Sequence, residues 1–324
     1  MNQHSQGKNP AAAGQGQSQT AEAKERRTPW WRLRARLILV PLDGSAEAKV
    51  ALVAARKVAH IASASITIVY VSDEALSGEE LLERVDLRRE DTIGMVLEQV
   101  PGDPATAITH VAAQRHAMLI VMTISGKTTA QGWTISPILD TVLQTAPCPV
   151  LLLRPELAGR MEGVEKPSRL LLPLDGTPSS AAAIGPALDL ANSTQAEVDI
   201  LYVAGREPLP QEPGSFTAPF YVDQSQYEWP SWAQEFTSRF GTALGQVKST
   251  TRTRVFLRSG GTAEEILRFA TENQTDLIVL EWRGTADVQH RAVVRAVLEK
   301  MPCPVLLLQP PEKRHGWTAD PHTA

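Results

Sequence analysis

The chain has 324 residues, enough for two ordinary cores, and its 32 Lys and Arg against 36 Asp and Glu give a net charge of -4. The first 36 residues are basic, with seven Lys and Arg against two Glu, so the rest of the chain is clearly acidic. Such a body binds phosphate backbones poorly, so no nucleic-acid partner is expected. No stretch approaches the ~20 apolar residues of a membrane span, and no apolar signal region opens the chain, so no transmembrane segment and a cytoplasmic location are predicted.

Two long stretches of the chain repeat the same sequence signals. An apolar run breaks at Asp43-Gly44-Ser45, and a second one breaks at Asp175-Gly176-Thr177. Each stretch closes with Pro-Cys-Pro-Val, around Cys148 and around Cys303. The repeat is too long for a solenoid unit and suits a whole domain, so two similar domains are predicted. The equivalent positions of the two cysteines favour structural thiols in a reducing compartment over a disulfide framework.

Hydrophobic periodicity predicts alternating strands and helices in both halves. Strands are expected at 37–42, 65–71, 94–100, 118–123 and 150–154, and again at 169–174, 196–203, 252–257, 277–281 and 304–308. Helices are expected at 46–62, 79–90, 105–115 and 136–145, and again at 179–191, 232–248, 262–273 and 286–300. Asp103, Ser136 and Thr262 are placed to cap the helices that follow them. This alternation predicts parallel sheets with helices on both faces.

Composition divides the chain into five parts. Residues 1–36 are expected to form a disordered basic tail, 37–155 the first domain, 156–167 a linker, 168–310 the second domain and 311–324 a polar tail. The second domain gains an insertion at about 205–230 that is rich in proline and aromatic residues. Two hypotheses remain open for it: a flap or partner-contact segment, and a surface insertion that packs on its own domain.

A short basic and aromatic stretch, Trp30, Trp31, Arg32, Leu33 and Arg34, precedes the first strand. Trp favours membrane interfaces and Arg favours anionic lipid, so one hypothesis is contact with a membrane surface. The other hypothesis is a lead-in whose Trp side chains pack on the edge of the domain. The second is favoured, because one short segment is a weak anchor.

Both halves resemble the universal stress protein family over residues 37–155 and 168–310. The resemblance lies in the two Asp-Gly-[Ser/Thr] turns, in Tyr70-Val71 and Tyr202-Val203, in Gly102-Asp103-Pro104, and in the Pro-Cys-Pro-Val entries to the last strands. It implies an α/β fold: two tandem Rossmann-like (adenine nucleotide alpha hydrolase-like) open five-stranded parallel sheets with helices on both faces. It also implies pairing through the last strand, so the two domains would form an intramolecular pseudo-dimer.

Many members of this family bind ATP through Gly-x2-Gly-x9-Gly-[Ser/Thr] after the fourth strand. By this resemblance the candidate nucleotide-binding residues are Asp43, Val71, Gly126, Lys127 and Ser136 in the first half and Asp175, Val203 and Gly284 in the second. The pattern is broken in both halves, since Thr123, Pro137 and Glu281 replace residues that would let backbone amides approach a phosphate. The alternative role of the two aspartates is to start the first loop of each half and to cap its helix. ATP is therefore a possible cofactor with a broken motif, and no cofactor is assigned.

The sequence supports two hypotheses for the function of this protein. The first is a non-catalytic tandem universal stress protein that acts in a stress response through protein or small-ligand contacts, with a protein partner that the sequence does not identify. The alternative is an ATP-binding switch or slow ATPase that uses the cleft of the first half. No nucleophile–base pair and no spacing of metal ligands stand out, so no catalytic and no metal-binding residue is predicted.

Overall fold

The computed structural model describes residues 36–124, 127–129, 132–161, 165–204, 251–284 and 287–309. Several predictions fall outside these ranges: the tails, the contacts of Trp30, Trp31, Arg32 and Arg34, the insertion at 205–230, and the helix expected at 232–248. The following description concerns the described residues alone.

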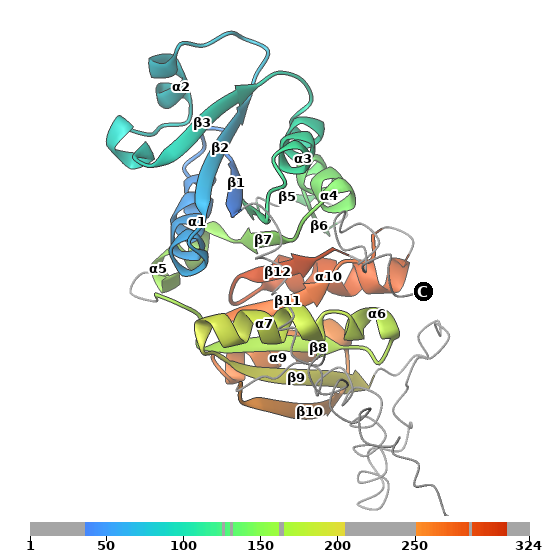
Figure 1. Ribbon diagram of the computed structural model, residues 1–324. Coiled ribbons are helices and arrows are strands. Elements are labelled where there is room, and N and C mark those ends of the chain that lie inside the picture. Colours follow the sequence, from blue (N-terminus) through green and yellow to red (C-terminus); the bar gives the residue numbers. More distant parts are fainter. Residues whose placement is uncertain are drawn as a thin grey trace, which may run out of the picture.

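Ten strands form one open sheet in the order β10-β9-β8-β11-β12-β7-β4-β1-β2-β3 (Figure 1). The strands of the first half are β1 (Leu37–Pro41), β2 (Ser65–Val71), β3 (Met95–Val100), β4 (Leu119–Thr123) and β7 (Val150–Leu153). Those of the second are β8 (Arg169–Leu174), β9 (Glu197–Ala204), β10 (Thr253–Ser259), β11 (Leu277–Glu281) and β12 (Val305–Leu308). Neighbouring strands are parallel within each half, and β7 and β12 are antiparallel. The predicted α/β class with mostly parallel, open sheets is confirmed.

Helices cover both faces of the sheet. In the first half they are α1 (Lys49–Ala62), α2 (Gly78–Arg84), α3 (Pro104–Gln114) and α4 (Pro137–Thr145). In the second they are α6 (Pro178–Ala181), α7 (Ile184–Thr194), α9 (Thr262–Glu272) and α10 (Val288–Lys300). Buried residues of α1 and α7 share one core with the sheet, and those of α3, α4, α9 and α10 share the core on the other face. In β1, Ile38 and Val40 enter the first core and Leu39 enters the second, which explains why the strand is apolar throughout.

Local side-chain chemistry fixes several helix starts. Asp103 accepts a hydrogen bond from the amide of Thr106 at 3.0 Å and caps α3, as predicted. Thr262 does not cap α9: the N-cap is Gly261, which makes no side-chain bond, and Thr262 is the first helical residue. The helix expected at 179–191 divides into α6 and α7, because Pro186 is tolerated only in the first turn of a helix.

Two connections contain more structure than expected. The loop after β4 forms an antiparallel hairpin of β5 (Lys127–Thr129) and β6 (Gly132–Thr134). The expected linker begins with a 3-10 turn, η4 (Pro155–Leu157), and a short helix, α5 (Ala158–Met161). Similarly, the helix expected at 79–90 is α2 followed by a 3-10 turn, η3 (Arg89–Thr92).

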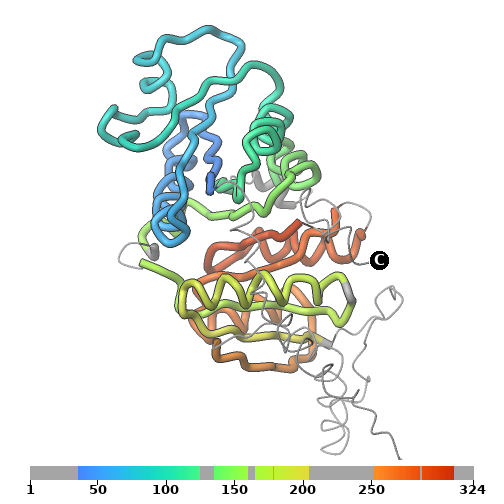
Figure 2. Tube along the Cα trace, in the orientation of Figure 1, coloured from blue at the N-terminus to red at the C-terminus, as the bar shows by residue number. Residues whose placement is uncertain are grey.

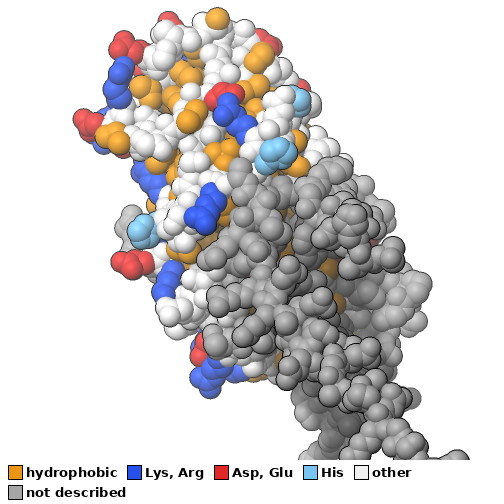
Figure 3. Space-filling model, in the orientation of Figure 1, with side chains coloured by type: hydrophobic (Ala, Val, Ile, Leu, Met, Phe, Trp, Pro, Cys, Tyr) orange, Lys and Arg blue, Asp and Glu red, His pale blue; other side chains and the backbone are white. Residues whose placement is uncertain are grey.

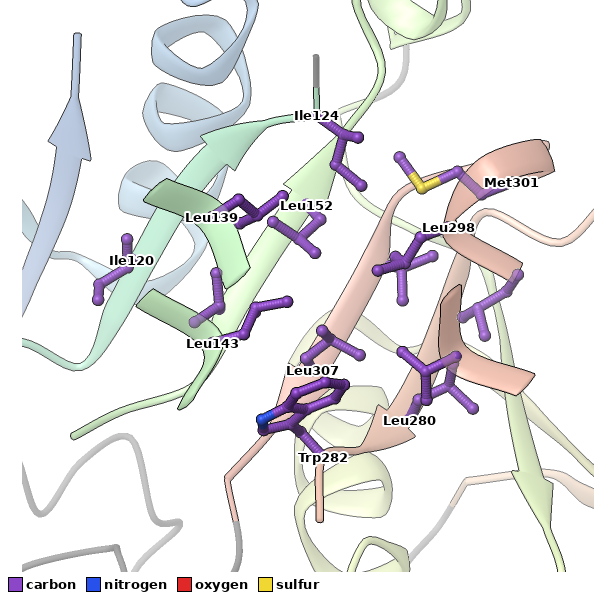
Figure 4. Close-up of a cluster of buried hydrophobic side chains, with 14 of the residues drawn as sticks. Ile120, Ile124, Leu139, Leu143, Leu152, Leu280, Trp282, Leu298, Met301 and Leu307 are labelled. Carbon is purple, nitrogen blue, oxygen red and sulfur yellow. The ribbon is translucent and has the colours of Figure 1, made fainter. Parts of the chain in front are cut away.

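The two halves meet along β7 and β12, the strands for which pairing was expected (Figures 1 and 2). Leu151 lies opposite Leu306, and every residue of both strands is buried. On one face, Leu139 and Leu143 of α4 lie across the seam from Leu298 of α10 (Figure 4). Without this pairing each half would expose an apolar edge strand, which is a liability for aggregation.

Polar contacts also cross the seam. Arg291 of α10 donates to both carboxylate oxygens of Asp140 in α4, at 3.0 and 3.2 Å. The Gln309 amide donates to the backbone oxygen of Leu143 at 3.4 Å. On the described part of the face in Figure 3, acidic and basic side chains are interspersed. Among the described residues no helix is long and apolar enough to cross a membrane.

Candidate functional site

The first candidate cleft lies where β1 ends at the carboxyl edge of the first half, the edge at which parallel α/β sheets bind ligands. Asp43 is exposed there, and its Oδ1 accepts from the Ser45 amide at 2.9 Å and from the Ser45 hydroxyl at 2.6 Å. The Ser45 hydroxyl oxygen in turn accepts from the amide of Ala48 at 3.1 Å. Asp43 therefore shapes the first loop, and Ser45 rather than Asp43 satisfies an amide at the start of α1.

Gly44 fits this loop beneath α2. Its φ of +86° favours glycine, and a Cβ at this position would lie 2.1 Å from the backbone oxygen of Arg84 at the end of α2. The turn after β1 is thus packed against protein backbone on one side. This contact limits how the loop can move to admit a ligand.

The other candidate nucleotide-binding residues of the first half that the structure describes have roles in the fold itself. Val71 ends β2, is half-buried and lies beside Val100 of β3. Ser136 caps α4 by accepting from the amide of Leu139 at 3.2 Å, and Pro137 is the first residue of that helix. The hydroxyl oxygen of Ser136 is therefore engaged by its own helix, as the predicted cap at Ser136 requires. Gly126 lies outside the described residues, and Lys127 is described only as the first residue of β5.

The corresponding position of the second half holds an arginine that sequence analysis missed. Arg283 follows β11, and its side chain is 9% exposed. Its guanidinium lies 2.8 Å from Asp175 Oδ2, 3.3 Å from Glu281 Oε2 and 3.3 Å from Asp287 Oδ2. It also donates to the hydroxyl of Thr177. One cation is thus surrounded by three carboxylates from three segments of the chain, at the edge where a nucleotide would enter.

Asp175 is more enclosed than Asp43. Its Oδ1 accepts from the Thr177 amide at 3.0 Å and from the Thr177 hydroxyl at 2.7 Å, which repeats the geometry of the first half. Burial acts to raise the pKa of Asp175, but the Arg283 guanidinium and hydrogen bonds from Thr177 and Ser180 outweigh it and hold that pKa below its ordinary value. Asp175 is therefore ionised and paired at neutral pH.

The start of α10 completes the cluster. The Asp287 carboxylate caps this helix by accepting from the amide of His290 at 2.9 Å. His290 Nε2 lies 2.7 Å from the backbone oxygen of Glu281, and because a carbonyl only accepts, Nε2 carries the hydrogen. Burial and the nearby Arg283 lower the pKa of His290, which is consequently neutral at pH 7. A carboxylate already occupies the helix N-terminus, where a phosphate would otherwise bind.

The remaining candidates of the second half play conformational or packing roles. Gly284 has a φ of +79°, and a Cβ placed on it would meet no atom within 4 Å, so the turn rather than a close contact requires glycine. Val203 is buried in β9, beside Arg258 of β10. No group of three or more His, Cys, Asp or Glu among the described residues could hold a metal ion. The structure thus brings Asp175 together with Glu281 and Asp287 through Arg283.

The two candidate sites differ in ion pairing and enclosure. Around Asp175 three carboxylates surround the single guanidinium, and the side chain of Asp175 is 19% exposed. Around Asp43 the described contacts are those with Ser45. The oxygens of Asp175 are therefore engaged by the chain itself, whereas Asp43 is exposed and, among the described residues, takes part in no ion pair.

These features define a tandem α/β protein with mostly parallel sheets, and comparison with known proteins places it in a family. The family model described as the universal stress protein family matches residues 75–154 and 167–309. The chain belongs to the universal stress protein family. It is 30% identical over 153 residues to a universal stress protein of Methanocaldococcus jannaschii, across 45% of this chain and 84% of that protein.

Solved structures support the fold. A universal stress protein from Archaeoglobus fulgidus aligns with a TM-score of 0.57 and 16% identity, covering 85% of this chain and 98% of that one. A putative universal stress protein from Pseudomonas aeruginosa aligns with a TM-score of 0.60 and 16% identity, covering 87% and 96%. At this identity the similarity establishes the shared architecture alone.

Proposed function

We propose that this chain is a non-catalytic tandem universal stress protein that acts in a stress response through protein or small-ligand contacts, without ATP bound in the manner that is common in the family. Membership of the family supports the stress-response role. The observation that carries the proposal is Arg283, which fills the second cleft with the chain's own ion pairs to Asp175, Glu281 and Asp287. A cytoplasmic site of action remains a prediction from the sequence.

The first half supports the same conclusion by a different route. The Ser136 hydroxyl oxygen accepts from an amide of α4, and Pro137 has neither a hydroxyl nor an N–H to donate to a phosphate. Thr123, the last residue of β4, pairs with Leu153 of β7 and carries a β-branched side chain. The two donors that the family's pattern would supply at the helix start are therefore missing from this half.

A specific observation favours the alternative, an ATP-binding switch or slow ATPase in the first half. Asp43 is exposed and, among the described residues, its hydrogen bonds are those with Ser45 and no ion pair involves it, whereas Asp175 is bound to Arg283. An exposed acceptor at the carboxyl edge of the sheet can bind an incoming hydroxyl or amino group. The first cleft is therefore the place where the alternative is tested.

Calorimetric titration with ATP and Mg²⁺ decides between the two functions. For the full-length protein we expect a dissociation constant near or above ~1 mM. The variant Thr123→Gly/Ser136→Gly/Pro137→Ser restores the family's pattern in the first half, and one recovered charge-assisted hydrogen bond should improve affinity about tenfold or more. Ser136→Gly alone is the matched control, because it weakens the helix start without freeing an N–H at 137. Micromolar ATP binding by the unmodified protein, with release of phosphate, would instead establish the alternative.

A further inference from the structure

A cavity of about 520 Å³ lies at the seam between the two halves, away from both nucleotide clefts. This volume falls within the range of small-molecule sites, roughly 300–1,000 Å³. Leu151 and Leu306, which are opposite each other across the β7–β12 seam, line it together with Leu153. Val58 of α1 and Leu190 of α7 also line it. Both halves contribute, so the cavity exists only in the paired arrangement.

The strand register shows that the cavity is elongated across the sheet. Because β7 and β12 are antiparallel, the amino ends of the strands of the two halves lie at opposite edges of the sheet. Met118 and Leu119, at the amino end of β4, line the cavity, and so do Asp276 and Leu277, at the amino end of β11. The cavity therefore reaches from one edge of the sheet to the other along the four-residue seam strands.

The two ends differ in their polar groups. Arg36 and Lys57 of the first half bring positive charge to one end. At the other end stand Glu165, Lys166 and Asp276. The carboxylate of Asp276 is already used, since its Oδ2 accepts from the Ser168 amide and hydroxyl and from the Arg169 amide at 2.7 to 3.0 Å. An anionic group is therefore favoured at the end of Arg36, and a neutral polar group at the end of Asp276.

Thr275 supplies an independent sign of a missing polar partner. Its side chain lines the cavity, the residue is 7% exposed, and its hydroxyl oxygen is buried with no hydrogen-bond partner. A buried hydroxyl without a partner is destabilising, and such groups in native structures call for an explanation. A polar atom of a ligand in the cavity would supply this partner, once rotation about the Cα–Cβ bond of Thr275 turns the hydroxyl toward it. Ala117 stands at the equivalent position of the first half, so this hydroxyl is particular to the second.

We propose that the seam cavity binds an elongated amphiphile with an apolar chain, a carboxylate at one end and a neutral hydrogen-bonding group at the other. The apolar chain lies over Leu151 and Leu306, the carboxylate lies toward Arg36, and the neutral group hydrogen-bonds with Thr275. This specifies a small-ligand contact of the kind named in the proposed function. Because the site is separate from both clefts, the ATP titration can fail while this proposal stands, and the converse also holds.

The probes are 12-hydroxydodecanoate and dodecanoate, titrated into the full-length protein by calorimetry. We expect 12-hydroxydodecanoate to bind tighter than about 0.1 mM and dodecanoate about five- to tenfold more weakly, the factor that one neutral hydrogen bond supplies. In Thr275→Val this preference should disappear while the stability to urea stays equal or rises, because the unpartnered hydroxyl has gone. ATP should not compete with either probe.

A second pair of variants keeps the test independent of Thr275. Val58→Trp fills the wall of the cavity and should abolish binding of both probes. Val53→Trp is the matched control on the same helix, because Val53 is 39% exposed and does not line the cavity. Absence of binding by the unmodified protein, binding that persists in Val58→Trp, or equal affinity for the two probes would each overturn the proposal.

Discussion

Replacing Arg283 by methionine tests whether the ion-pair cluster holds the second cleft closed. The substitution keeps an unbranched side chain but leaves Asp175, Glu281 and Asp287 without their shared cation. The side chains of Glu281 and Asp175 are 2% and 19% exposed, so water compensates them poorly. Removing one partner of a buried ion pair costs about 3–5 kcal/mol. Because Asp287 is 30% exposed and Asp175 keeps its hydrogen bonds to Thr177, the lower end, about 3 kcal/mol, is expected.

Urea unfolding at pH 7 measures this loss, and its pH dependence identifies the cause. In the unmodified protein the pKa of Asp175 is below its ordinary value of 3.8, so its contribution to stability is present above pH 3.8 and is lost as the pH falls through the lowered pKa. Without Arg283, one cause that lowers this pKa is gone, so the pKa of Asp175 is higher in the variant than in the unmodified protein. The charged carboxylate is therefore less stabilised in the variant, and protonation removes this difference as the pH falls. The difference in unfolding free energy between the two proteins should therefore shrink as the pH falls toward and below 3.8.

Arg84→Met is the matched control, because Arg84 pairs with Glu74 at 3.0 Å while both side chains are more than half exposed. An exposed pair of this kind is worth less than about 1 kcal/mol. If Arg283→Met also cost less than about 1 kcal/mol, or if its cost did not change between pH 7 and about pH 3, the cluster would not be a strongly coupled buried ion-pair network. The argument from the second cleft would then fail.

Three further predictions concern single residues. His290, whose pKa is lowered by burial, should make the protein lose stability as the pH falls below 6.5, and His290→Gln should flatten this slope in urea titrations; an unchanged slope would mean that the ring is not buried neutral. Ser136→Ala should cost about 1 kcal/mol in urea unfolding through loss of the α4 cap, and no cost would show that the bond to Leu139 is not made. Gly44→Ala should lower the melting temperature well beyond Gly94→Ala, because both have positive φ but only Gly44 faces a backbone oxygen; equal shifts would refute the close contact.

The strands could be predicted well because they are buried on both faces. The strands expected at 65–71 and 277–281 match β2 and β11 residue for residue, since each is a short apolar or β-branched run bounded by polar turns. The caps at Asp103 and Ser136 were also accessible, because a cap is a contact between neighbours in sequence. Short-range chemistry of this kind is visible without a structure.

Long-range contacts could not be predicted in the same way. Asp175 and Arg283 are far apart in the sequence and meet only because β8 and β11 are adjacent in the sheet. The sequence offered a weak signal, an arginine between two acidic residues at 281 and 287, which has no meaning until the strand order is known. The hairpin after β4 was not predicted, because its two strands of three residues each are too short to show a hydrophobic period.

The equivalent aspartates of the two halves, Asp43 and Asp175, share one local loop motif but have different surroundings. Asp43 and Asp175 make the same two hydrogen bonds to the residue two positions later, so the loop alone is enough reason for an aspartate at both sites. Their surroundings then diverge. Arg283 pairs with Oδ2 of Asp175, the oxygen that does not bind Thr177, whereas no described cation pairs with Asp43. The proposal that the second half binds no nucleotide therefore depends on Arg283, and an aspartate at this position is by itself no argument for nucleotide binding.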